Sequence, residues 1–342
     1  MSSMHSIALV ETTRGYPASG NITENVHMGS VAVVDTRGKL LCSAGDAHYM
    51  TFTRSALKPF QALPFILDGG ADRFGLSRTE LALLCASHSG EDKHLRGVQS
   101  ILGKIGLDDT MLECGCGVPL YFDAVGLPVP ERAWTQVHHN CSGKHSGFLG
   151  WCRLHNVAHA GYVEQAHPLQ MAIRERMGEL AGMPASSLPI GMDGCSAPNY
   201  AMPLSRLAHM FARLAQGNAD PVHGSAMGAL CEAMTGHPEL VSGEARSDLV
   251  YMSAGAGDWV TKIGADAVQT IGVRSAGIGI AIKIADGAKH ALQTATYAVL
   301  DQLGLLDGEQ RALLEQYRQP VLQNVRGATV GDIRAVFRLQ RA

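Results

Sequence analysis

Strand-forming and helix-forming patterns occupy different parts of this chain, and their positions constrain its fold. Short β-prone runs lie near both ends, at residues 30–35, 39–43, 267–271, 277–284 and 329–337. Helical periodicity fills the middle, at residues 79–86, 91–105, 168–183, 204–216 and 225–234, and returns after Asp286, a candidate N-cap for a helix through Leu303. We therefore expect one antiparallel sheet built from both chain ends, with a helical region between them.

The same pattern predicts the domain organisation. The chain has 342 residues, and neither a Pro/Ser-rich linker nor an internal repeat divides it. We expect an α/β (α+β) fold in a single discontinuous catalytic domain. Its sheet lobe would comprise about residues 1–75 and 245–342, and its helical lobe about residues 76–244.

Composition and charge exclude several classes of protein. Hydrophobic residues make up 46% and charged residues 17%, a balance typical of a buried globular core rather than a disordered chain. The net charge is -3 and no stretch is strongly basic, which argues against nucleic-acid binding. No segment has the ~20 apolar residues of a membrane span. The first residues lack the pattern of a signal peptide. We expect a cytoplasmic protein whose eight cysteines are thiols.

Ser55 and Lys58 form the first candidate catalytic pair. A helix is predicted to begin near Ser55, and residues three apart lie on one face of a helix. A serine needs a neighbouring base to act as a nucleophile, and a lysine becomes that base when burial lowers its pKa. Pro59 follows directly and is tolerated near a helix start, where free N–H groups stabilise an oxyanion. For an isolated Ser-x-x-Lys, an exposed helix cap with a solvated lysine is the more common explanation.

Two later segments support catalysis. Ser87 lies in a polar turn after an apolar helix, and Lys262 stands two residues before Gly264 at a predicted hairpin. Serine β-lactamases and penicillin-binding proteins have the same order: Ser-x-x-Lys, a Ser-bearing turn, and a Lys-x-Gly strand. Taken singly, Ser87 fits a helix C-cap and Lys262 an exposed lysine. The three elements in this order favour a catalytic interpretation.

A dense polar run at residues 138–147 suggests a metal site. Cys141 stands three residues before Lys144, and Cys195 lies in a second glycine-flanked loop. Cysteine thiolates suit zinc, which would take a nitrogen ligand from His139 or His145 and a water. Cys141 as a nucleophile and a purely structural loop are the rival interpretations, and the residues alone leave all three open.

These segments resemble the third class of L-asparaginases, the rhizobial type of the asparaginase II family. The resemblance is carried by residues 54–61, 87–91, 139–145, 192–195 and 277–287, of which the run Asn-Cys-Ser-Gly-Lys-His is the most specific. It implies a fold similar to serine β-lactamases, hydrolysis of L-asparagine to L-aspartate and ammonia, and a homodimer. A histidine near Gly117, expected in many relatives, is missing.

The resemblance also implies roles for particular residues. It pairs Ser55 with Lys58, and Ser87 with a late lysine, which we assign to Lys262 from its Lys-x-Gly context rather than to Lys283. It implies zinc held by two cysteines, a lysine and water, which are Cys141, Lys144 and Cys195 in this chain. Three further residues are assigned to substrate binding: Arg54, His139 and Asp193.

The expected mechanism is acyl transfer at a side-chain amide. Ser55 would attack, Lys58 would accept its proton, and Ser87 with Lys262 would pass a proton to the departing ammonia. Zinc would orient the substrate, and attack by a zinc-bound hydroxide is the competing mechanism. The alternative functions are a cytoplasmic glutaminase, a β-lactamase- or peptidase-like serine hydrolase, and a non-enzymatic zinc-binding protein. One methylene separates asparagine from glutamine, so the sequence does not distinguish them.

Overall fold

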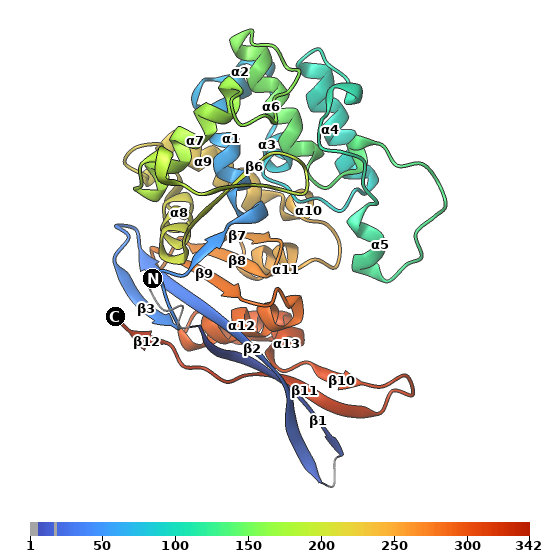
Figure 1. The fold of residues 1–342 in the computed structure, drawn as a ribbon, viewed down its shortest axis with the longest axis vertical. Coiled ribbons are helices and arrows are strands. Elements are labelled where there is room, and N and C mark those ends of the chain that lie inside the picture. Colours follow the sequence, from blue (N-terminus) through green and yellow to red (C-terminus); the bar gives the residue numbers. More distant parts are fainter. Residues whose placement is uncertain (1–5, 17–18) are drawn as a thin grey trace.

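The main sheet draws its strands from both ends of the chain (Figure 1). The computed structural model describes residues 6–16 and 19–342. The central order is β10 (Val321–Gln323), β11 (Thr329–Ala335), β1 (Ile7–Tyr16), β2 (Gly20–Asp35), β9 (Ile278–Ile284), β8 (Val268–Val273) and β7 (Trp259–Gly264), and β3 (Leu40–Ala44) joins β2 to β12 (Gln340–Arg341). Every neighbouring pair is antiparallel. The prediction of one antiparallel sheet from both ends is therefore confirmed.

Helices fill the middle of the chain, as predicted. They are α1 (Lys58–Leu67), α2 (Gly70–Phe74), α3 (Arg78–Leu84), α4 (Asp92–Lys104), α5 (Leu120–Val125), α6 (Ser142–His155), α7 (Pro168–Ala181), α8 (Leu204–Gln216), α9 (Gly224–Gly236), α10 (Pro238–Val241) and α11 (Ser247–Ala254). A small sheet orders β4 (Met50–Phe52), β6 (Pro198–Pro203) and β5 (Ile190–Met192) among them. After the last hairpin come α12 (Lys289–Gln302) and α13 (Gly308–Arg318).

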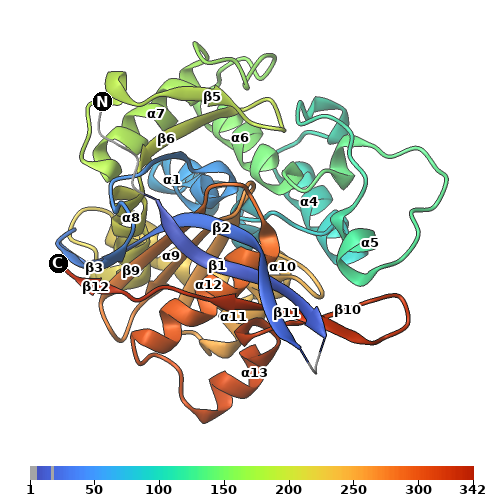
Figure 2. The ribbon, with the colours of Figure 1, turned by 60° about the horizontal axis from the view of Figure 1, so that its bottom comes forward.

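The sheet separates two apolar cores. Successive residues of a strand point to opposite faces, and β2 shows this directly. Ala32 and Val34 belong to the core shared with the helical region, whereas Val31 and Val33 belong to the core under α12. In Figures 1 and 2 the helical region lies on one side of the sheet, and α12 and α13 lie on the other. The sheet thus presents one face to the elements that carry the polar motifs.

A pair of glycines brings α8 unusually close to the sheet. Gly272 of β8 pairs in register with Gly279 of β9. A Cβ atom on Gly279 would lie 1.9 Å from the Ala208 carbonyl oxygen, and one on Gly272 would lie 2.2 Å from that of Phe211. Both distances are far below van der Waals contact, so only glycine allows the helix backbone to approach at these two positions.

Several predicted boundaries are corrected. The α-helix does not begin at Ser55, because Arg54–Leu57 form a 3-10 turn and α1 starts at Lys58 with Pro59 in its first turn. Asp286 is not the N-cap of α12, which is Ala288. The Asp286 carboxylate instead accepts a hydrogen bond from the Ala288 N–H (3.0 Å) and lies 2.7 Å from His27. Strand β1 and the first ten residues of β2 were not predicted.

The remaining short helical turns connect these elements. They are η2 (Asp109–Met111), η3 (Gln136–His138), η4 (Ala185–Ser187) and η5 (Gly217–Ala219). In the described part of the chain, none of the helices combines the length and the apolar character that a membrane crossing requires.

Candidate active site

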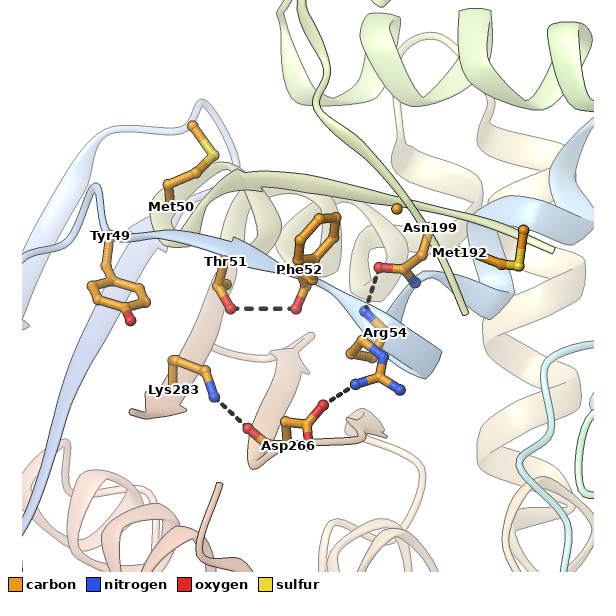
Figure 3. A pocket seen from close by; sticks show the side chains of 10 residues that line it. Tyr49, Met50, Thr51, Phe52, Arg54, Met192, Asn199, Asp266 and Lys283 are labelled. Atoms are coloured by element: carbon orange, nitrogen blue, oxygen red, sulfur yellow. Dashed lines mark hydrogen bonds and ion pairs between the residues drawn. The ribbon is translucent and has the colours of Figure 1, made fainter. Parts of the chain in front are cut away.

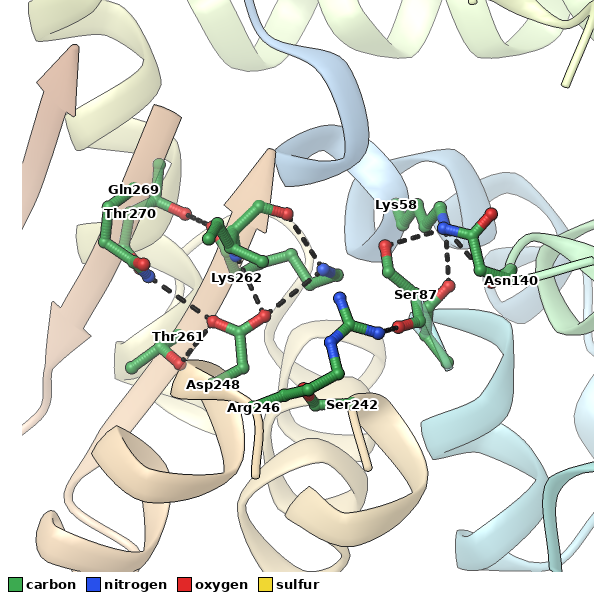
Figure 4. A network of polar contacts seen from close by, with 12 residues as sticks. Lys58, Ser87, Asn140, Ser242, Arg246, Asp248, Thr261, Lys262, Gln269 and Thr270 are labelled. Atoms are coloured by element: carbon green, nitrogen blue, oxygen red, sulfur yellow. Dashed lines mark hydrogen bonds and ion pairs between the residues drawn. The ribbon is translucent and has the colours of Figure 1, made fainter. Parts of the chain in front are cut away.

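Lys58 is the centre of a buried polar cluster. Its Nζ donates to the Ser87 hydroxyl at 2.9 Å and to two carbonyl oxygens, those of Ala86 at 2.6 Å and Asn140 at 3.4 Å (Figure 4). Lys58 is fully buried and Ser87 is 3% exposed. The start of α1, the turn after α3 and the turn before α6 therefore meet at a single amine.

Ser55 is linked to Lys58 through the backbone, where the Lys58 N–H donates to the Ser55 carbonyl oxygen, and not through the two side chains. Its side chain is half-buried, and no hydrogen bond links it to the lysine among the residues that the structure describes. Ser55 lies in a 3-10 turn before α1, in which residues three apart lie on the same side, so the local turn does not by itself keep the two side chains apart. Lys58 instead reaches across to the turn after α3.

The environment of Lys58 favours its neutral form. Burial lowers the pKa of this lysine, and the nearby Lys144 cation lowers it further, whereas Cys141 and Cys195 oppose the shift. A lysine must be neutral to accept a proton, so this environment suits a general base.

Lys262 lies on the other side of Ser87 and is held by a carboxylate that the sequence did not predict. Its Nζ donates to Asp248 at 3.3 Å and to the Ile263 carbonyl at 2.9 Å, and both charged side chains are fully buried. Burial lowers the pKa of Lys262 to about 8, while Asp248 acts to raise it. Within the described residues, Lys262 makes no hydrogen bond to Ser87.

Arg246 connects Ser87 with the segment that carries Asp248. The Arg246 guanidinium donates to the Ser87 carbonyl oxygen. Arg246 directly precedes α11, and Asp248 lies in the first turn of that helix. The rival lysine, Lys283, donates to the carbonyls of Asp266 and Ile284 and lies beside a different pocket. Of the two lysines that the sequence proposed, Lys262 is the one whose pKa is affected by Lys58 and Arg246.

The thiols of Cys141 and Cys195 lie next to Lys144 in the interior. Lys144 Nζ lies 3.0 Å from Cys195 Sγ, and all three residues are buried. The facing Cys141 thiol lowers the pKa of Cys195, and Lys144 and His145 act in the same direction against burial. Cys195 in turn raises the pKa of Cys141, as does burial. This environment favours a thiolate at Cys195.

This donor set fits a zinc ion in its chemistry. Two thiols and an amine are available, and the neighbouring His145 Nε2 is a buried nitrogen without a hydrogen-bond partner in the described chain. His145 Nδ1 lies 2.8 Å from the Tyr162 hydroxyl, which fixes the ring. Across residues 6–16 and 19–342, no three His, Cys, Asp or Glu side chains gather into a metal site, so a zinc ion here depends on Lys144.

Arg54 bridges two carboxylates at the mouth of a pocket. Its Nε donates to Asp193 at 2.9 Å, and its guanidinium also pairs with Asp266 (Figure 3). The Arg54 backbone has a positive φ of 52°, and its N–H donates to Asn199 at 3.2 Å. Residues other than glycine rarely adopt a positive φ, so the contacts around Arg54 must stabilise this backbone conformation.

The pocket beside Arg54 has a volume of about 410 Å³. Its walls include Tyr49, Phe52, Asn199 and Lys283 (Figure 3). The Lys58–Ser87 pair does not line it, whereas Arg54, which directly precedes Ser55 in the chain, does. Because the Arg54 guanidinium already pairs with two carboxylates, the carboxylate of a ligand would have to displace one of them.

His139 lies against the thiol segment. Its Nδ1 accepts a hydrogen bond from the Cys141 N–H at 3.1 Å. Burial lowers its pKa to about 4. His139 is therefore neutral near pH 7 and acts as an acceptor toward Cys141.

Four residues near these groups were missed by the sequence interpretation: Arg246, Asp248, Tyr162 and Asp266. The run Arg246-Ser247-Asp248 precedes an apolar helix, which is an ordinary helix-start signal and does not indicate that both charges point inward.

A serine hydroxyl that is hydrogen-bonded to a buried lysine is typical of hydrolases that act by acyl transfer. In this chain a pair of buried thiols lies beside the lysine. A family model described as L-asparaginase II matches residues 10–335. The chain therefore belongs to the L-asparaginase II family, as its motifs predicted.

Comparisons with other known proteins add little. The chain is similar to a crystal structure of Mglu in its native form in the presence of 4.3 M NaCl, with 15% identity and a TM-score of 0.44. A second native Mglu structure has 16% identity and a TM-score of 0.40. The matches cover 82% of this chain and 62% and 66% of those chains, so this protein spans less than two thirds of their length. No curated protein matches the chain.

Proposed function

We propose that the protein is an L-asparaginase that hydrolyses L-asparagine to L-aspartate and ammonia by acyl transfer. Membership of the L-asparaginase II family supports the substrate. The observation that carries the mechanism is the buried Lys58 amine 2.9 Å from a serine hydroxyl, in surroundings that favour the neutral amine. Once neutral, this amine can take the proton of an attacking hydroxyl.

In the proposed reaction, Ser55 is the nucleophile, since it directly follows Arg54, which lines the pocket. Its Oγ forms a bond to the side-chain carbonyl carbon while its proton passes to Lys58. The carbon–nitrogen bond then breaks, and the leaving nitrogen takes a proton through Ser87 and Lys262, which yields ammonia and an aspartyl ester. Water then attacks the ester carbon, Lys58 returns its proton to the departing serine oxygen, a proton of the water passes to Lys262, and aspartate is released.

The 2.9 Å contact between Lys58 and Ser87 favours a second candidate for the nucleophile. In that version Ser87 attacks, and Ser55 positions the substrate. The products are the same, and the two versions differ in which serine carries the ester.

Substrate recognition is proposed to use Arg54, Asp193 and His139. The Arg54 guanidinium would bind the α-carboxylate of asparagine and Asp193 its ammonium group, which requires both residues to open their mutual ion pair of 2.9 Å. His139 is proposed to stay neutral and to contact the substrate from the side of the thiols.

Zinc is proposed to bind Cys141, Lys144, Cys195 and a water. When bound, it would polarise and orient the substrate at the edge of the buried cluster. We also propose a homodimer, a fold of the serine β-lactamase type, and one discontinuous domain with lobes at about residues 1–75 plus 245–342 and 76–244.

Ammonia release from asparagine and from glutamine, with and without added zinc, tests the proposed function. We expect release from asparagine to exceed that from glutamine. Release from glutamine alone would identify a glutaminase, and hydrolysis of nitrocefin without ammonia release would identify a β-lactamase-like enzyme. Absence of turnover in zinc-loaded, folded protein would leave a zinc-binding protein and would refute the proposal.

A further inference from the structure

Asp248 is a buried carboxylate that accepts four hydrogen bonds, one of them from Lys262. It is 1% exposed. One oxygen accepts from the Thr261 hydroxyl at 3.0 Å and the Gln269 amide at 3.4 Å, and the other accepts from the Ile263 N–H at 2.9 Å and Lys262 Nζ at 3.3 Å. Four donors from β7 and β8 therefore fix this carboxylate in one orientation (Figure 4).

The same helix start also holds Ser87. Arg246, two residues before Asp248, donates to the Ser87 carbonyl oxygen. In Figure 4 the Lys262 amine and the Arg246 guanidinium lie between Asp248 and Ser87. One short segment thus contacts both members of the proposed Ser87–Lys262 pair, although these two make no hydrogen bond to each other within the described residues.

We propose that Asp248 is a positioning residue for catalysis, which keeps Lys262 charged and fixed at the side of the reaction centre away from Lys58. This inference rests on the proposed function, in which Lys262 supplies a proton and a positive charge. A buried lysine without a partner carboxylate sheds its charge, because burial disfavours the ammonium form. Asp248 is the only carboxylate within hydrogen-bond reach of Lys262 in the described chain.

The groups around Lys262 decide the direction of the expected effect. Asp248 and Arg246 face it from the start of α11, Lys58 from α1, and Cys85 from the end of α3. Arg246, and Lys58 once it has accepted the serine proton, disfavour the charge of Lys262, and Asp248 is the group that opposes them. Replacing Asp248 by a neutral isostere should therefore lower the pKa of Lys262, and the charged form should be lost at lower pH.

The test is the pH dependence of ammonia release by the Asp248→Asn variant. Because the proposed reaction needs the Lys262 ammonium, the wild-type rate should fall above about pH 8. In Asp248→Asn this alkaline limb should move down by about one pH unit or more, and kcat should fall by about 10²-fold with KM nearly unchanged. In a Lys262→Met background the same substitution should cause no further loss of kcat.

A matched control separates positioning from a structural role. Asp220 is also buried and forms an ion pair with Arg213 at 2.7 Å, but it lies outside the polar cluster. Asp220→Asn should reduce thermal stability and leave the alkaline limb in place. An equal shift of the limb in both variants, or an unmoved limb in folded Asp248→Asn, would overturn the proposal.

The kinetics of Asp248→Glu and the NMR titration of the Lys262 amine test the same role of Asp248 in other ways. If Asp248→Asn does not fold, Asp248→Glu can be measured instead, because it keeps the negative charge but moves it. In this variant the alkaline limb of the pH–rate profile should remain at the wild-type pH while kcat falls. Full activity of Asp248→Glu would refute the positioning role. The Nζ resonance of Lys262 in ¹⁵N-lysine-labelled protein reports the same coupling without turnover. A resonance shift in a protein that releases no ammonia would refute the proposed function and leave the coupling standing, whereas an unshifted titration would refute the coupling.

Discussion

The Lys58 amine donates to Ser87, a residue 29 positions away, at 2.9 Å, and within the described residues it makes no hydrogen bond to the side chain of Ser55 three positions before it. The motif suggested a local pair, Ser55 with Lys58, whereas the observed hydrogen bond joins Lys58 to a serine of a separate element. Because tertiary packing brings Ser87 to Lys58, Ser87 is a candidate for activation as well as Ser55, and both serines need to be tested.

Substituting each serine should separate their roles. If Ser55 is the nucleophile, Ser55→Ala should lower kcat by at least about 10⁴-fold, and Ser87→Ala by about 10²-fold because only a proton relay is lost. Ser89→Ala is the matched control, since Ser89 is buried in the same turn but donates to the Ser242 carbonyl. Rapid-quench mass spectrometry should find the aspartyl ester on the peptide with Ser55, and an ester on Ser87 would reverse the assignment.

Replacing Arg54 should affect substrate affinity more than turnover. Lysine keeps the charge of Arg54 but cannot bind a carboxylate in bidentate fashion, so Arg54→Lys should raise the KM for asparagine by about tenfold. Arg37→Lys, at an exposed position, should leave KM unchanged. Steady-state kinetics measure both, and a change confined to kcat would assign Arg54 to the chemistry instead.

Zinc content should depend on Cys195 and not on buried cysteines in general. Cys195→Ser replaces the proposed thiolate ligand with a poorer one and should remove most of the bound zinc. Cys152→Ser changes an equally buried cysteine of α6 and should retain it. Elemental analysis of the purified proteins gives the zinc per chain, and equal occupancy in the two variants would contradict the proposed site.

Stability should fall on the acid side, in part because of His94. Burial lowers the pKa of His94 to about 4. Its Nδ1 accepts from the Glu91 N–H at 3.2 Å, and protonation would break that bond. The unfolded chain binds this proton near pH 6.5, so the contribution is complete above that pH and is lost as the pH falls toward 4, by on the order of 3 kcal/mol. Urea unfolding at pH 7 and pH 4.5 should show that the free energy of unfolding decreases less in His94→Gln than in the wild type or in the surface variant His155→Gln.

The close approach of α8 to the sheet should make Gly279 intolerant of a side chain. A Cβ there would meet the Ala208 carbonyl oxygen at 1.9 Å, so Gly279→Ala should destabilise the fold by about 2 to 3 kcal/mol. Gly236→Ala, at the end of α9 with open space around it, should be neutral or slightly stabilising. Thermal unfolding compares them, and equal melting temperatures would mean that α8 can shift without cost.

The sequence predicted those parts of the fold whose signals are local. The helices α4, α7 and α8 carry helical periodicity because one face of each is apolar, whereas β8 and β9 are short β-prone runs that are buried on both faces. Strand β1 and the start of β2 were missed, since residues 20–26 of β2 are exposed on every position and give no alternation. Their pairing is decided by register with distant strands.

The site was predictable in its residue types and less so in its contacts. Ser87 and Lys58 are brought together as members of one cluster, but their direct hydrogen bond depends on where α1 begins. Asp248 carries no signal of its own in the sequence, because an aspartate in the first turn of a helix is common and usually faces water. Only the packing of α11 against β7 turns it toward Lys262.

The order of the strands has a consequence for synthesis on the ribosome. Strand β2 pairs along Gly29–Asp35 with β9, whose residues are made about 250 positions later. Until β9 has been synthesised, the apolar segment Val31–Val34 of β2 has no pairing partner on that edge. Nascent chains with unpaired strand edges are prone to aggregate. We therefore expect slow maturation and a dependence on chaperones during translation, a cost that follows from building one sheet out of both ends of the polypeptide.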